Sequence, residues 1–120
     1  GKARRIDKPG HKFSRIHVAD IANVLIASIA QPNPGAIYNV CDNEAIEASR
    51  VTEFAADLLG VEPPPLLSFA EAAKTMLPMG LSFWHDNRLV DNTRIRSELG
   101  VVLDYPDYRA GLTALFNELN

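Results

Sequence analysis

The chain has 120 residues, of which 47% are hydrophobic and 22% charged, and its formal net charge is −3. This composition is ordinary for one soluble folded domain, and it excludes a disordered chain and a strongly basic nucleic-acid binder. No apolar run reaches the roughly 18 residues of a membrane span, and a single cysteine excludes an internal disulfide. We therefore expect a cytoplasmic protein that binds neither nucleic acid nor membrane.

The first fifteen residues carry six cations and one acid, Asp7. They show no hydrophobic period, and Pro9 and Gly10 mark a turn where a signal peptide would be apolar. Residues 1–12 are therefore expected to form an irregular basic arm, which is either a solvated surface or a site for a phosphate-bearing ligand. Because the chain opens on Gly1 rather than methionine, we also expect it to be a piece of a longer protein.

Residues 13–18 alternate between apolar and polar side chains, which predicts a half-buried strand. Arg15 and His17 would share one side of this strand, and Ile16 and Val18 the other. The polar side either faces a cleft, where it would present donors to an anion, or lies in water at the edge of the fold.

A helix is predicted next, with Asp20 as its cap, because the carboxylate can accept a hydrogen bond from an unpaired backbone N–H. Apolar residues recur at helical spacing up to Ile29, and residues 31–35 (QPNPG) end the helix. Residues 36–41 are rich in β-branched and aromatic side chains, which predicts a second short strand.

Ser49 is expected to cap the following helix, in which apolar residues from Val51 to Leu59 share one side before Gly60 ends it. Residues 63–65 are three prolines, which predict an extended link.

Ser68 and Glu71 form a capping box, which predicts a helix up to about Leu77, stopped by Pro78. Residues 81–86 (LSFWHD) show no clear period.

Residues 88–90 predict a further short strand, and a helix begins at Asn92 or Thr93 and ends at a glycine. An extended run follows, and Asp107 is expected to cap the last helix. About five helices and two or three strands result. The predicted fold is α+β, a mostly helical small domain that comprises residues 1–120.

Several kinds of site are absent from the sequence. The glycines stand at positions 1, 10, 35, 60, 80, 100 and 111, and no two have the spacing of a dinucleotide-binding or phosphate-binding loop. No histidine pair has the spacing of a helical zinc site. Cys41 ends an apolar run, which favours a small buried residue over a reactive thiolate. The acid pairs Asp42 with Glu44 and Asp57 with Glu62 are interpreted as turn or surface acids.

The candidate binding residues are three cations for an anionic group, one imidazole donor and two aromatic side chains that could cover a ring: Lys12, Arg15, Arg88, His17, Phe83 and Trp84. For Phe83 and Trp84, ordinary core packing is the alternative to a lip over a ligand.

Five segments occur in an order that resembles a known family: SRIHVADIANVL, PGAIYNVCDNEAI, RVTEFAADLLG, NRLVDNTRIRSELG and YPDYRAGL. They are similar to the C-terminal part of extended short-chain dehydrogenases/reductases, the NAD(P)-dependent nucleotide-sugar epimerase/dehydratase group. The resemblance extends from about Arg4 to Leu115. The family's Tyr-x-x-x-Lys pair is absent, since Tyr38, Tyr105 and Tyr108 have no lysine four residues on.

The resemblance implies a substrate-binding portion that lacks the Rossmann half and its catalytic residues. NAD or NADP would bind the intact protein and not this fragment, which alone would be inactive in the family's hydride chemistry. The implied partners are an anionic substrate such as a sugar nucleotide, the missing Rossmann domain, and a further copy of the chain. The alternative function is a noncatalytic interaction or sensor module that docks an acidic partner through its basic N-terminal arm.

Overall fold

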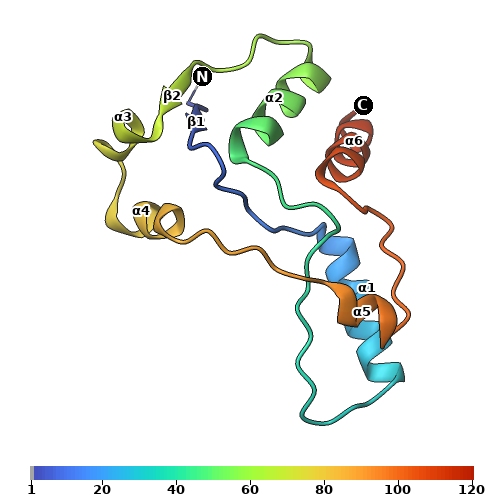
Figure 1. The fold of residues 1–120 in the computed structure, drawn as a ribbon. Helices are drawn as coiled ribbons and strands as arrows, with labels where there is room; N and C mark the ends of the chain where they lie inside the picture. The colour runs from blue at the N-terminus through green and yellow to red at the C-terminus, as the bar shows by residue number, and fades with distance from the viewer. Residues whose placement is uncertain (1) are drawn as a thin grey trace. The chain divides into compact units, whose positions relative to one another are not determined.

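The computed structural model describes residues 2–120, which form two compact units. Unit 1 comprises the described residues up to Phe13 together with Ile46–Arg88, and unit 2 comprises Ser14–Ala45 and Leu89–Asn120. Six helices and one two-stranded parallel sheet are found in the described residues, which confirms the predicted α+β, mostly helical class (Figure 1). That residues 1–120 act as a single domain stays a prediction.

Unit 1 contains the sheet, in which β1 (Arg5–Asp7) pairs with β2 (Leu66–Ser68) in parallel. The expectation of an irregular arm over residues 1–12 is therefore wrong for β1. The prolines before β2 hold the chain extended. Residues 66–68 can therefore form backbone hydrogen bonds with β1. The sequence of neither segment predicts this pairing.

Three helices complete unit 1: α2 (Ala48–Leu59), α3 (Phe69–Ala73) and α4 (Pro78–His85). Gly60 ends α2 as predicted, since its φ of +67° suits a left-handed cap. The N-cap of α2 is Glu47, without a side-chain cap bond, so the expected cap at Ser49 is wrong.

The Ser68 half of the capping box is confirmed, because the Ser68 hydroxyl accepts from the Glu71 backbone N–H at 3.2 Å, whereas the Glu71 carboxylate pairs with Lys74 at 3.0 Å. However, α3 is shorter than predicted and ends at Ala73. Pro78 begins α4 instead of stopping the earlier helix, because proline suits the first helical position.

Unit 2 consists of α1 (Val18–Ala30), α5 (Thr93–Ser97) and α6 (Tyr108–Leu119) with extended segments between them. Asp107 caps α6 as predicted, accepting from the Ala110 backbone N–H at 3.0 Å. The core is formed by buried aliphatic residues of α1, α5 and the chain after α5: Val24, Ile95, Leu99, Val101 and Leu103.

The N-cap of α1 is His17 and not Asp20, so that prediction is wrong. The ring Nδ1 of His17 accepts from the Ala19 backbone N–H at 3.1 Å. Val18 is consequently the first helical residue and is 72% exposed, whereas Ile16 packs against the core. Ile16 and Val18 therefore do not lie on one apolar face of a strand, and that prediction is wrong.

The three predicted strands do not form among the described residues. Of residues 13–18, only Phe13 makes a bridge, to Ile46, and residues 36–41 and 88–90 have no ladder. In residues 36–41, neighbouring side chains still lie on opposite sides of the extended backbone: Tyr38 packs on the core, and Ile37 is 76% exposed. Alternation favours an extended backbone, but a strand also needs a partner segment at hydrogen-bonding distance.

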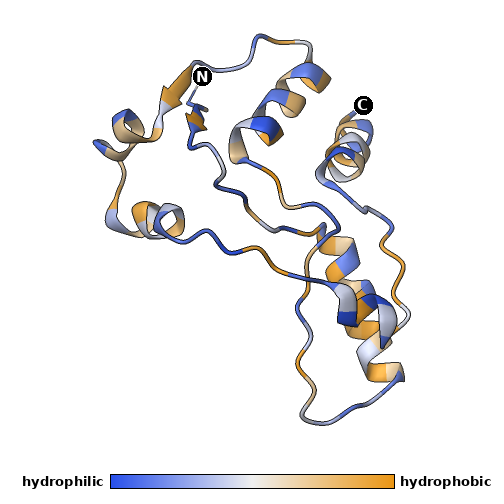
Figure 2. Ribbon diagram, viewed as in Figure 1, coloured by the Kyte–Doolittle hydropathy of each residue, from blue (hydrophilic) through white to orange (hydrophobic). Residues whose placement is uncertain are grey.

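Much of α1 consists of hydrophobic residues (Figure 2). Its exposed aliphatic side chains, each between 40% and 78% accessible, are Val18, Ile21, Leu25, Ile26 and Ile29. No helix in residues 2–120 has the length and apolar character needed to cross a bilayer.

Candidate functional site

The six candidate binding residues fall in both units. Lys12, Phe83, Trp84 and Arg88 lie in unit 1, and Arg15 and His17 lie in unit 2. The two sets are positioned by different local structures.

Trp84 lies inside an aromatic cluster of unit 1. Its ring stacks on His11 at a centroid distance of 5.1 Å, meets Phe13 edge-on at 5.2 Å and lies 5.8 Å from Phe69. The Lys8 ammonium contacts the backbone oxygen of Trp84 and lies 4.3 Å from the centre of the Phe69 ring. Packing with these rings therefore accounts for the position of Trp84 without a ligand.

The other unit 1 candidates are exposed. The Phe83 side chain is 63% accessible, and Arg88, 82% accessible, pairs with Asp86 at 3.0 Å. The backbone N–H of Lys12 donates to the Asn87 side-chain oxygen at 3.1 Å, which leaves its ammonium outside that contact. These residues could meet a ligand, but a surface pair such as Arg88–Asp86 contributes little to stability.

His17 has a defined donor in unit 2. Because its Nδ1 accepts from the Ala19 backbone, the neutral ring carries its proton on Nε2. The ring is held by stacking on Tyr105 at 4.0 Å and by close packing against Gly111, where an added Cβ would lie 3.3 Å from the imidazole. The predicted role of His17 as a hydrogen-bond donor is chemically consistent with this tautomer.

Arg15 is half-buried, and its Nη1 is buried without a hydrogen-bond partner. Burial lowers the pKa of its guanidinium, and the nearby Asp42 carboxylate opposes that effect. The backbone also links these residues, since the Asp42 N–H donates to the Arg15 carbonyl at 2.7 Å. An unpaired buried donor is costly, so Nη1 of Arg15 favours an additional hydrogen-bond acceptor.

Asp42 lies at a polar pocket of about 300 Å³ within unit 2. Burial raises the pKa of the Asp42 carboxyl, although the Glu44 backbone N–H and Arg15 partly offset this. The pocket residues come from the chain after the predicted second strand, from the segment that precedes α5 and from α5 itself: Asp42, Asn43, Ala45, Leu89, Val90, Asp91, Asn92, Thr93 and Arg96.

The polar groups of this pocket are held by a hydrogen-bond network. The amide of Asn92 donates to the Cys41 carbonyl at 3.0 Å and to the Asn43 side-chain oxygen at 2.8 Å. Arg96 donates through Nε to the Asn92 oxygen at 3.1 Å, which leaves its terminal nitrogens available. An arginine fork beside carboxylates and an amide can bind a phosphate or carboxylate and orient hydroxyl groups.

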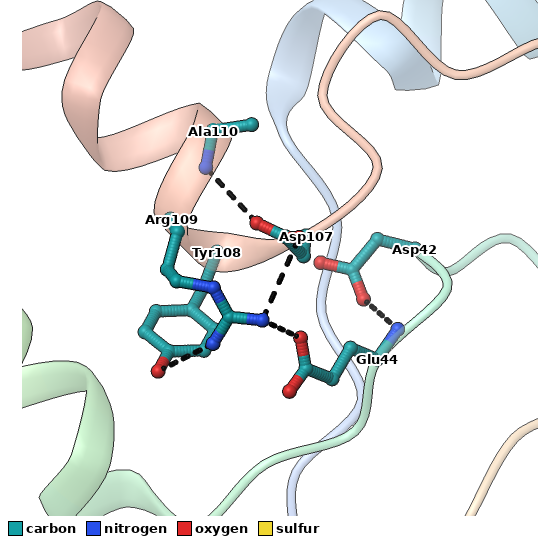
Figure 3. A network of polar contacts seen from close by, with 6 residues as sticks. All are labelled: Asp42, Glu44, Asp107, Tyr108, Arg109 and Ala110. Carbon is teal, nitrogen blue, oxygen red and sulfur yellow. Dashed lines mark hydrogen bonds and ion pairs between the residues drawn. The ribbon is translucent and has the colours of Figure 1, made fainter.

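A second network ties residues 42–44 to the start of α6 (Figure 3). Arg109 contacts Glu44 at 2.6 Å, Asp107 at 3.7 Å and the Tyr108 hydroxyl at 3.0 Å. The Tyr108 hydrogen bond is the largest cause that raises the Arg109 pKa. Asp42 accepts from the Glu44 backbone N–H at 3.0 Å, so the network orients one wall of the pocket.

Metal and thiol chemistry receive no support. No group of three or more metal-ligating side chains occurs in residues 2–120. Cys41 is 4% exposed, and burial raises the pKa of its thiol. It is a buried small residue, as predicted.

Most of the pocket is not predicted by the sequence. The sequence indicates a turn acid at Asp42 and a helix start at Asn92. Asn43, Asp91 and Arg96 carried no separate signal, because residues about fifty positions apart form this pocket. Only the run of four polar residues from Asp91 to Arg94 marked the region, and such runs are common at helix starts.

No known family profile matches the chain. Protein YeeZ of Escherichia coli K12 is 27% identical over 97 residues, which cover 81% of this chain and 31% of YeeZ. A solved structure of a functionally unknown conserved protein from Silicibacter pomeroyi DSS is 52% identical, with a TM-score of 0.94 over 98% of this chain and 42% of that one.

The crystal structure of human epimerase family protein SDR39U1 with NADPH is 16% identical, with a TM-score of 0.80 over 98% of this chain and 39% of that one. The chain thus spans about a third of YeeZ and about two fifths of each solved protein. The fold of the chain is similar to that of a portion of the human protein.

Proposed function

We propose that this chain is the substrate-binding portion of a longer NAD(P)-dependent protein related to the epimerases and dehydratases of the short-chain dehydrogenase/reductase type. The observation that carries the proposal is the fold shared with a protein solved with NADPH, together with the partial coverage of that protein. The polar pocket of unit 2 is the site that we propose for the substrate.

The residues of this chain do not fit a dinucleotide. A pyrophosphate needs closely spaced glycines so that backbone can approach it, and the seven glycines are scattered. The nicotinamide chemistry would therefore belong to the part of the longer protein outside this chain. The residues described bind and orient the substrate.

Unit 2 offers three donors for an anionic substrate. Arg96 lines the pocket and has free terminal nitrogens. Arg15, with an unpaired buried Nη1, and His17, with a proton on Nε2, belong to the same unit but are not among the residues that line the pocket. A charge-assisted hydrogen bond contributes about 1.5–3 kcal/mol, so two or three such contacts give only weak binding once the entropy of association is subtracted. We expect millimolar affinity for the isolated chain.

The alternative, an interaction module docking through the basic arm, has less support. Arg4 donates to Thr75 at 2.9 Å, Arg5 pairs with Glu53 at 2.8 Å, and the Lys8 ammonium contacts the Trp84 carbonyl. Three of the arm's cations thus contact other parts of unit 1, and Lys2 and Lys12 are the exposed remainder.

The test is a titration of the chain with UDP-glucose, followed by amide chemical shifts. The Arg96→Gln and Arg15→Gln variants should weaken binding, each by about fivefold or more. Arg50→Gln is the matched control, since Arg50 is an exposed arginine of α2 in unit 1. Equal affinity of all four proteins would contradict the assignment.

A second titration uses NADPH fluorescence. We expect no change with this chain, whereas micromolar binding would show that the proposed division between cofactor and substrate portions is wrong.

A further inference from the structure

Unit 1 contains an apolar groove that the proposed function does not use. Its volume is about 440 Å³, within the range typical of small-molecule sites. The lining is mostly small and aliphatic, from α2, its C-terminal turn and the proline link: Ala3, Thr52, Ala55, Ala56, Leu59, Val61, Glu62, Pro64 and Pro65.

Arg5 links α2 to the proline segment beside the groove. Its Nη1 pairs with Glu53 of α2 at 2.8 Å, and its Nε donates to the Pro64 carbonyl at 2.6 Å. The Arg5 side chain is only 18% exposed, and its backbone N–H donates to the Pro65 carbonyl at 3.3 Å. One residue of β1 thus fixes the proline wall and the helical wall together.

The apolar surface in the groove is accessible. Leu59 is 60% exposed and Val61 56% exposed. Each aliphatic carbon covered by a ligand is removed from water, which favours binding of an apolar body.

Glu62 is the one charged residue among the described residues that line the groove. Glu62 makes no hydrogen bond or ion pair within residues 2–120. The C-terminal turn of α2 also lines the groove. Its backbone carbonyls carry the negative end of the helix dipole, and the turn contains no basic residue that would neutralise it. The Thr52 hydroxyl donates to the Ala48 carbonyl at 3.3 Å, so toward a ligand it can act as an acceptor.

From these observations we propose that the groove binds a small amphiphilic cation, a protonated amine with an apolar ring or branched body. The body packs on Ala55, Leu59 and Pro64, and the ammonium lies beside the Glu62 carboxylate. This site is separate in its residues from the polar pocket of unit 2 and does not depend on the proposed function.

The experiment titrates the chain with tryptamine, its neutral analogue tryptophol and its anionic analogue indolepropionate. Amide shifts of Ala55, Leu59 and Val61 report binding. We expect tryptamine to bind most tightly. Glu62→Gln should weaken tryptamine by about two- to fivefold and leave tryptophol unchanged.

Glu118→Gln is the matched control, an exposed acid of α6 in unit 2. Ala55→Leu should fill the groove and weaken tryptamine and tryptophol alike. If that variant fails to fold, the exposed Glu62→Gln change still decides the charge argument. Equal binding of the three compounds, or no shift at Ala55, Leu59 and Val61 at millimolar tryptamine, would overturn the proposal.

Discussion

Replacing Asp20 with alanine should destabilise unit 2 more than any exposed substitution. The side chain is fully buried, with 0% of it accessible. One carboxylate oxygen accepts from the Asp104 backbone N–H at 2.9 Å and the other from the Tyr105 N–H at 2.9 Å. Asp20 therefore links α1 to the segment that leads into α6.

The magnitude follows from these two bonds. A hydrogen bond to a charged group contributes about 1.5–3 kcal/mol. Asp104 is exposed and Tyr105 half-buried, so water can partly replace the lost acceptor and the lower end applies. We expect Asp20→Ala to lower the free energy of unfolding by about 3 kcal/mol.

Urea unfolding followed by circular dichroism measures this loss. With a urea slope of about 1.5 kcal/mol/M, the midpoint should fall by about 2 M. The control is Asn23→Ala, which removes a donor to Asp20 at 3.1 Å and to the exposed Asp104 carboxylate at 3.0 Å but leaves both backbone amides paired. It should cost about 1 kcal/mol. A midpoint for Asp20→Ala equal to that of Asn23→Ala would refute the reasoning.

Three further predictions concern a buried acid, a helix end and a helix start. Burial raises the pKa of Asp42 above its ordinary value of 3.8, so the folded state holds the proton more tightly and this group's contribution to stability falls as the pH rises from 3.8 through the folded pKa. Asp42→Asn should remove that fall: its urea midpoint relative to the parent chain should rise from acidic to neutral pH, and a relative midpoint that falls would contradict this sign. Gly60→Ala should cost about 1 kcal/mol because φ is +67°, while Gly80→Ala in α4, where nothing lies within 4 Å of an added Cβ, should be neutral or stabilising; thermal midpoints in the reverse order would rule this out. Ser68→Ala should cost about 1 kcal/mol by removing the cap of α3, and an unchanged thermal midpoint would mean that the cap does not contribute.

The sequence was sufficient where structure depends on neighbours in the chain. The apolar spacing in residues 51–59 and the following Gly60 predicted the body and end of α2. Ser68 and Asp107 predicted two caps, because each accepts from an N–H three residues ahead. The α+β class followed from the same local patterns.

Local sequence patterns were not sufficient where a segment contacts a partner far away in the chain. Residues 36–41 have a strand-forming composition but no ladder in the described chain, whereas Arg5–Asp7, without a hydrophobic alternation, pairs with Leu66–Ser68. Asp20 looked like a cap, yet its carboxylate binds amides more than eighty residues away.

The candidate site is likewise predicted only in part. The charge and spacing of Arg15 and His17 indicate them as binding residues, and the Nε2 donor of His17 follows from its position at the start of α1. The pocket around Asp42, Asn92 and Arg96 required the tertiary structure. The sequence determines helix propensity, capping and turns, because these act over three or four residues along the chain. The tertiary structure decides the partner of a strand, the donors to a buried carboxylate and the walls of a pocket. These depend on which distant residues the fold brings to hydrogen-bonding distance.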